Sequence, residues 1–270
     1  MKKIIIIIGL LLLTISSCST DETDIPTKEN SKPLLKTIEV INTTNGSTTV
    51  FTYNGYKIIQ VTSNLYIGVY KIIYTYTGDY ITKEDGYIND QLIVSTEYTY
   101  ESNKLKTVIY KDTNSGTIFP AMNQNKLVYT YQPDNTVDIG IYSYSLNNWE
   151  LVAPYPKMKI YFKDGNIVKR EKFNTDGMIS STIIYEYDTK PNKYANIIGF
   201  DKLFFTGSFT NNFNRHFNIQ DLNNVNNIIR NESDTYKYNY NSDGFPIEQI
   251  NTYFSSPSRS PIGEKKYTYY

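Results

Sequence analysis

The sequence predicts an all-β protein in which consecutive antiparallel hairpins, a meander, form one strongly curved or barrel-like sheet. The first observation is composition: 27 Tyr and 12 Phe accompany a single Trp, and tyrosine suits a pleated, half-buried strand. The second is a repeated unit of two aromatic residues two positions apart, two to four turn residues, and an apolar residue usually five positions after the second aromatic. The unit occurs as FTYNGYKII, YTYTGDYIT, YTYESNKLK, YTYQPDNTV, IYFKDGNIV, YEYDTKPNK and YNYNSDGFP.

Each part of the unit has a physical reason. Aromatics two apart, such as Tyr98 and Tyr100, lie on the same face of a strand because side chains alternate. Turn residues such as Asn54 and Gly55 tolerate positive φ and suit tight hairpins. The apolar residue after the turn, Leu105 in the third unit, begins the return strand. Each unit is therefore predicted to be a β-hairpin, and because one hairpin is marginal alone, neighbouring hairpins should share one sheet.

Residues 191–230 interrupt the repeat and are rich in asparagine. Within them, YANIIGFDKLFF is apolar enough for a short helix or a buried turn, and Gly199 near its middle disfavours the helix. We expect this asparagine-rich insertion to pack across the sheet or to close one end of it.

Residues 1–17 are predicted to be a secretory signal peptide. The segment contains two early lysines, the apolar run 4–15 and two small serines. The run is too short for a spanning helix, which takes about 20 apolar residues. Residues 18–35 are polar and aperiodic, typical of a disordered tether, which leaves 36–270 as a single all-β hairpin-repeat domain.

Cys18, directly after this segment, is the only cysteine of the chain. An exported protein cannot form an internal disulfide with one thiol. Ile15-Ser16-Ser17-Cys18 resembles a bacterial lipobox, which implies cleavage between Ser17 and Cys18, acylation of Cys18 with lipid chains such as palmitate, and a stable membrane anchor. The alternative is an unmodified cysteine beside a conventional cleavage site.

The residues after Cys18 read STDETD. In position and acidity Asp21, Glu22 and Asp24 are similar to the signal that sends lipoproteins of Bacteroidetes-type bacteria to the outer face of the outer membrane. The stretch also fits a solvated tether. We expect a lipid-anchored outer-membrane protein, with surface exposure favoured over an anchor facing the periplasm.

Two further segments carry a more specific resemblance. YEYDTKPNKYANIIGF and LNNVNNIIRNESDTYKYNYNSDGFPIEQI resemble a family of Bacteroidetes lipoproteins of unknown function with a porin-like fold, whose hairpins are similar to the tyrosine-aspartate repeats of Rhs-type proteins. The resemblance covers roughly residues 36–270 and departs at Lys193, where the family has the proline of an asparagine-proline pair. It implies a curved or barrel-like all-β sheet and transfers no catalytic residues.

Charges along the chain argue against lipid-facing strands, which would alternate strictly with apolar residues over about 9 to 11 positions. In KMKIYFKDGNIVKREKF, Lys157, Lys159 and Lys163 fall on one face. The terminal EKKYTYY ends in an aromatic, as outer-membrane barrels do, and suits the last strand of a soluble sheet equally well. We expect the domain to be soluble once its lipid is removed.

The sequence offers little for catalysis, metals or cofactors. His216 is the only histidine, which excludes a multi-histidine metal site, and no Walker or Rossmann glycine pattern occurs. Loss of residues 1–17 removes two lysines and takes the formal charge from 0 to −2, which indicates no nucleic-acid surface. We therefore expect no catalytic residue, metal or cofactor. The carboxylate pairs to consider are Glu84 with Asp85 and Glu171 with Asp176, all in or beside predicted turns.

Two roles fit these features. The first is a non-catalytic binding module for a polysaccharide, a peptide or an envelope partner, with tyrosine rings as stacking platforms. The alternative is a structural or assembly scaffold of the cell envelope that pairs through a free sheet edge. A glycoside-hydrolase-like enzyme ranks third. An exposed row of aromatics in a concavity would favour the polysaccharide.

Overall fold

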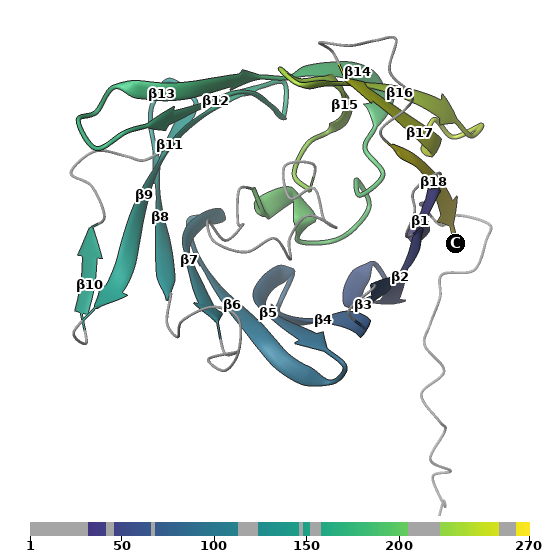
Figure 1. Cartoon of the computed structure of the whole chain (residues 1–270), viewed down its shortest axis with the longest axis horizontal. Coiled ribbons are helices and arrows are strands. Elements are labelled where there is room, and N and C mark those ends of the chain that lie inside the picture. The colour runs from purple at the N-terminus through teal and green to yellow at the C-terminus, as the bar shows by residue number, and fades with distance from the viewer. Residues whose placement is uncertain are drawn as a thin grey trace, which may run out of the picture.

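The strands of the protein form one curved sheet. The computed structural model describes residues 32–41, 46–65, 68–112, 124–145, 148–151, 158–204, 222–253 and 263–270. In these ranges the sheet closes almost completely into a barrel (Figure 1), which confirms the predicted all-β meander. No helix of the described part is long and apolar enough to cross a membrane. The strands are β1 (Leu35–Ile41), β2 (Ser47–Asn54), β3 (Lys57–Leu65), β4 (Gly68–Thr77), β5 (Tyr80–Ile88), β6 (Gln91–Glu101), β7 (Lys104–Asp112), β8 (Asn125–Tyr131), β9 (Thr136–Ser145), β10 (Asn148–Leu151), β11 (Met158–Lys163), β12 (Asn166–Phe173), β13 (Ile179–Ile184), β14 (Glu186–Pro191), β15 (Asn226–Arg230), β16 (Asp234–Tyr240), β17 (Pro246–Tyr253) and β18 (Gly263–Tyr269).

The pairings run round the barrel in chain order. Strands β1 to β9 pair antiparallel with their sequence neighbours. The long β9 then pairs with β11 along its first half and with β10 along its second. β13 and β14 are one run broken at Tyr185, and β13 pairs with β12 whereas β14 pairs with β15. β18 pairs with β17 and β1, so the ring closes. The shortest pairing in this ring is that of β15 with β16, in which Arg230 lies opposite Thr235.

Six of the seven repeated units are hairpins, as predicted. In the hairpin β6–β7, Tyr100 lies opposite Leu105 after a register shift at Thr99. Its turn residues Ser102 and Asn103 have φ of 50° and 63°. Two consecutive residues with positive φ are typical of the type I′ turn, whose twist matches the flanking strands.

The unit at 185–193 is not a tight hairpin, so that prediction is wrong. β14 ends at Pro191, which lies opposite Asn226, and the Asn192 amide still donates to the Val225 carbonyl at 2.9 Å. Asn192 then begins a turn in which its side-chain oxygen accepts a hydrogen bond from the Tyr194 amide at 2.9 Å. The partner of β14 begins only at Asn226. Residues 192–225 therefore separate β14 from β15 in the chain.

The described parts of that loop, 192–204 and 222–225, are called the plug here because they lie inside the ring of strands (Figure 1). The one-turn 3-10 helix η1 (Phe200–Lys202) follows Gly199, whose φ is 89°. The Phe200 ring packs against Tyr74 of β4 with 6.0 Å between ring centroids, and Phe204 packs against Tyr129 of β8 at 5.3 Å. The plug thus places the apolar side chains of Phe200 and Phe204 inside the barrel.

The inner face of the barrel wall is apolar, and the outer face mixes polar side chains with exposed apolar ones such as Val69 and Ile73. On β4, Tyr70, Ile72 and Tyr74 are buried and alternate with more exposed residues. The outer face carries cross-strand threonine pairs, such as Thr99 with Thr107 at 2.6 Å between hydroxyls. It also carries cross-strand ion pairs between lysine and acidic residues. The alternation of β4 therefore turns Tyr70 and Tyr74 toward the interior of the barrel.

A tyrosine ladder links successive hairpins at the end of the barrel where their tight turns lie. In four strands, the hydroxyl of the last tyrosine donates a hydrogen bond to a main-chain carbonyl of the preceding hairpin. That carbonyl lies at the start of the return strand. Each of these tyrosines thus packs its ring against the core and links its strand to the preceding hairpin by a hydrogen bond. Phe162 occupies the same position on β11 but has no hydroxyl to donate. At this hairpin the main-chain pairing of β11 with β9 continues as far as Thr136. The rungs are Tyr100 to Ile81 (2.7 Å), Tyr131 to Leu105 (3.0 Å), Tyr187 to Ile167 (2.6 Å) and Tyr269 to Pro246 (2.7 Å).

Candidate functional site

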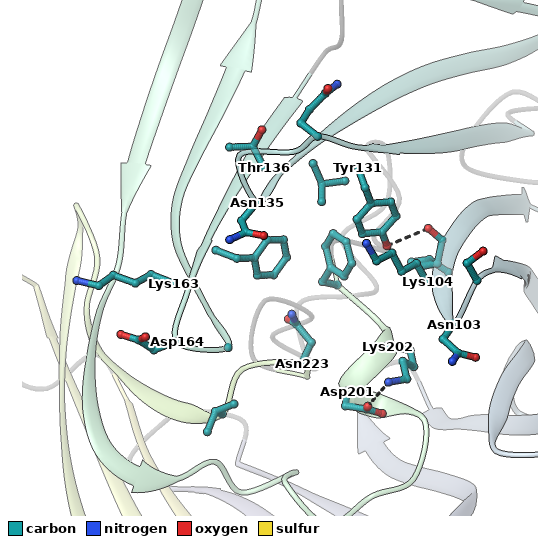
Figure 2. Close-up of a pocket in the computed structure, with 18 residues that line it drawn as sticks. Asn103, Lys104, Tyr131, Asn135, Thr136, Lys163, Asp164, Asp201, Lys202 and Asn223 are labelled. Carbon is teal, nitrogen blue, oxygen red and sulfur yellow. Dashed lines mark hydrogen bonds and ion pairs between the residues drawn. The ribbon is translucent and has the colours of Figure 1, made fainter.

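A pocket of about 670 Å³ lies at the turn end of the barrel (Figure 2). Three sides come from the turns of the hairpins β6–β7, β8–β9 and β11–β12, and the plug forms the fourth. These hairpins are distant in sequence, and the curvature of the sheet brings their turns around one opening. We call this opening the turn-end pocket.

The floor of the turn-end pocket is aromatic. Phe204 of the plug packs edge-on against Phe162 of β11 at 5.1 Å and against Tyr131 of β8 at 6.4 Å between ring centroids. The Tyr131 hydroxyl donates to the Leu105 carbonyl at 3.0 Å. Burial raises the pKa of Tyr131 to about 12, so this hydroxyl stays protonated at neutral pH. The three rings form a fixed apolar surface.

The rim of the pocket is polar. Asn103 and Asn135 come from two of the turns, and both have left-handed φ, of 63° and 62°. The Lys104 ammonium lies 4.8 Å from the centroid of the Tyr131 ring. Asp201 and Lys202 of η1 form an ion pair of 2.7 Å, drawn as a dashed line in Figure 2. The rim therefore offers hydrogen-bonding groups around the aromatic floor.

Asn223 contributes a buried acceptor to this pocket (Figure 2). Its Oδ1 atom is shielded from solvent and has no hydrogen-bond partner among the described residues. The neighbouring Asn224 is engaged, because its side-chain oxygen accepts the Ile167 amide at 2.9 Å and holds this part of the plug on β12. A buried acceptor without a donor is unfavourable, so Asn223 is suited to a ligand that donates a hydrogen bond.

The structure separates the first carboxylate pair considered from sequence. Glu84 faces the interior and accepts a hydrogen bond from the Tyr98 hydroxyl, and burial raises its pKa from 4.5 to about 7. Asp85 pairs with Lys83 at 2.8 Å. Adjacent residues of β5 point to opposite faces, so these carboxyls do not face a common substrate position. Tyr74 lies near Glu84, and burial raises its own pKa well above the ordinary value.

The second pair is also divided between local interactions. Glu171 of β12 accepts from the Tyr161 hydroxyl at 2.7 Å and pairs with Lys169 at 2.9 Å, and the Lys169 hydrogen bond lowers its pKa. Asp176 accepts the Met178 amide at 2.9 Å in the turn after β12. Within the described ranges, no three His, Cys, Asp or Glu side chains gather as a metal site would require.

Several residues singled out from the sequence lie outside the described residues, so their roles stay predictions. They are Ser17, Cys18, Asp21, Glu22, Asp24 and His216. Sequence reasoning named no ligand-binding residue and missed the turn-end pocket. Its rim residues belong to the predicted turns and to the insertion, but their meeting around one opening depends on the curvature of the sheet.

Comparison with known proteins supports the fold. No protein-family model and no curated protein matches the chain. A porin-like protein from Bacteroides vulgatus is similar over 88% of this chain and 99% of its own, with 12% sequence identity and a TM-score of 0.51. A porin-like protein from Bacteroides uniformis is similar over 87% and 98%, with 11% identity and a TM-score of 0.49. The chain thus has a porin-like fold.

Proposed function

We propose that this chain is a non-catalytic, lipid-anchored protein of the outer membrane that binds a polysaccharide in its turn-end pocket. The observation that carries the proposal is the aromatic floor of Tyr131, Phe162 and Phe204 beneath a rim of amides. Aromatic faces pack on the apolar faces of sugar rings, and side-chain amides pair with hydroxyl groups. The volume of about 670 Å³ falls in the range of small-molecule pockets.

Asn223 supports a hydroxyl-rich ligand. Its buried Oδ1 atom needs a donor, and a sugar hydroxyl supplies one. The Asp201 and Lys202 side chains of η1 already pair with each other, and Lys104, Lys163 and Asp164 also line the pocket.

The outer wall supports attachment through a lipid on Cys18. In a bilayer, the outward threonine and lysine pairs would face hydrocarbon, which is unfavourable. The first described residue, Lys32, donates its amide to the Tyr56 hydroxyl at 3.1 Å in the turn between β2 and β3. A tether from Cys18 would therefore reach the barrel at the end that holds the pocket.

Removing the Asn223 acceptor should weaken carbohydrate binding. A glycan screen on the lipid-free protein would identify the ligand, and calorimetry would then compare Asn223→Ala with Asn64→Ala, an exposed asparagine of β3. Loss of one hydrogen bond predicts about 3- to 10-fold weaker binding for Asn223→Ala and no change for Asn64→Ala. Equal affinities would exclude the pocket, and a screen without any bound glycan would contradict the function.

The anchor has its own test. We expect Cys18→Ala to remain unprocessed and to incorporate no radioactive palmitate, and a labelled variant would contradict lipidation. Protease treatment of intact cells, compared with lysed cells, would then show whether the barrel faces the medium or the periplasm.

A scaffold role is the second candidate, and β13 favours it. Among the described strands only β12 pairs with β13, which leaves its other edge open. Ile184 is 57% exposed, and Met178 and Ile179 are also exposed beside that edge. An extended segment of another envelope protein could add to it as a strand. Crosslinking in intact cells, with partners mapped to residues 178–184, would distinguish this role from polysaccharide binding.

A further inference from the structure

A second aromatic surface lies on the outside of the barrel. It consists of Tyr142 and Tyr144 of β9, Trp149 of β10 and Lys126 of β8, and we call it the outer aromatic platform. Trp149 lies opposite Tyr144, and Lys126 lies opposite Tyr142. Ile139 and Ile141, which precede Tyr142 on β9, are buried, so alternation turns Tyr142 and Tyr144 to the outer face.

The platform is ordered by ring contacts and remains accessible. The rings of Tyr144 and Trp149 meet edge-on with 5.1 Å between centroids. The Lys126 ammonium lies 5.0 Å from the Tyr142 ring and 4.9 Å from the Trp149 ring. Tyr144 is 40% exposed. Because these side chains stand on paired strands, the protein would lose little conformational freedom when a ligand binds there.

Lys126 differs in its partners from Lys71 and Lys111 of the outer wall. Lys71 pairs with Asp90 at 2.6 Å, and Lys111 pairs with Glu97 at 2.6 Å. Lys126 has no acidic partner within the described ranges of the chain. Among the described residues, its ammonium makes cation–π contacts with the rings of Tyr142 and Trp149. Such contacts are weak at exposed sites. An anion placed beside these rings would therefore complement the ammonium.

We propose that the outer aromatic platform binds an acidic polysaccharide. The rings of Tyr144 and Trp149 pack on sugar faces, and the Lys126 ammonium pairs with a uronate carboxylate. This site is separate from the turn-end pocket, because Thr136 at the other end of β9 lines that pocket. The proposal therefore does not depend on what the pocket binds.

A membrane surface is the rival partner, since Trp, Tyr and Lys also gather at bilayer interfaces. The position of the platform favours the polysaccharide. The described chain begins at Lys32, beside the turn of β2–β3, whereas Tyr144 and Trp149 lie at the opposite end of β9 from Thr136 and its turn. An anchor before Lys32 would therefore join the barrel at the end opposite the platform.

Trp149 makes the test direct, because it is the only tryptophan of the chain and its fluorescence reports on the platform alone. The full-length protein is titrated at low salt with polygalacturonate and with its fully methyl-esterified form. We expect a saturable change in Trp149 emission with the acidic polymer only, and the same change in Asn223→Ala. Loss of the charge-assisted contact in Lys126→Gln should weaken binding about 10-fold or more.

Lys71→Gln is the matched control, because its ammonium also lies over a ring, that of Tyr87 at 5.2 Å, but is paired with Asp90. Its affinity should stay within about twofold of the unchanged protein, since exposed ion pairs contribute little. The proposal is overturned if Trp149 emission does not respond, if the esterified polymer binds equally, or if both lysine variants lose equal affinity. A response to anionic phospholipid vesicles but not to polygalacturonate would assign the platform to the membrane instead.

Discussion

Replacing Glu84 by glutamine is expected to stabilise the protein at pH 8 by as much as about 3 kcal/mol. The carboxyl titrates near pH 7 when folded, against 4.5 ordinarily, because burial among tyrosines disfavours its charged form. Glutamine has no charge to bury and can still accept the Tyr98 hydrogen bond. The figure is an upper value because Glu84 keeps partial contact with solvent.

The same group sets a pH dependence with a defined sign. Between pH 4.5 and about 7 the folded protein binds a proton at Glu84 that the unfolded chain has lost. Stability therefore falls as pH rises through that window, by up to about 1.4 kcal/mol per pH unit, and is constant above it. Urea unfolding at pH 5, 6, 7 and 8 measures the slope, which Glu84→Gln should reduce.

Glu97→Gln serves as the control, because Glu97 pairs with Lys111 on the outer wall. Loss of an exposed ion pair should cost about 0 to 1 kcal/mol and leave the slope between pH 5 and 8 in place. If Glu84→Gln is as stable as the unchanged protein at pH 8 and keeps the same slope, Glu84 is not the buried acid that the structure shows.

Phe200→Ala is expected to cost about 3 to 5 kcal/mol, the usual price of truncating a buried phenylalanine. Phe200 is almost fully buried in the plug. Its ring contacts Tyr74 of the wall at 6.0 Å and Tyr194 of the plug at 5.7 Å between centroids. Urea unfolding measures the loss, and limited proteolysis should show faster cleavage within residues 192–204.

Val225→Ala provides a comparison within the same segment, since Val225 is 52% exposed. A surface substitution of this kind should change stability by about 0.5 kcal/mol or less. If both variants lose the same stability, or if Phe200→Ala loses none, the plug is not part of the barrel core.

The hairpins could be predicted because their signals are local. Tyr98 and Tyr100 share a face two positions apart, and the turn between β6 and β7 needs only Ser102 and Asn103. Six of the predicted hairpins follow from such short segments. The unit at 185–193 is not a hairpin, because its turn residues lead into the plug and β14 pairs with β15, which begins only at Asn226.

The turn-end pocket could not be predicted, because it depends on contacts between distant segments. Asn103 and Asn135 read as ordinary turn residues, and Asn223 lies in an asparagine-rich stretch without periodicity. They meet only because the sheet curves and the plug turns inward. Glu84 and Asp85 show the same limit, since their neighbours in space, and not their spacing, decide that one is buried and the other paired.

The pairing of β1 with β18 also has a consequence for biogenesis. Thr37 and Thr268, whose hydroxyls lie 2.7 Å apart, are separated by 231 positions in the chain. Ring closure must therefore wait until β18 is synthesised, whereas every tight hairpin can form as soon as its own turn emerges. Until then β1 presents an open edge to other chains, a state prone to aggregation. A newly made chain should need protection during this interval more than at any later time.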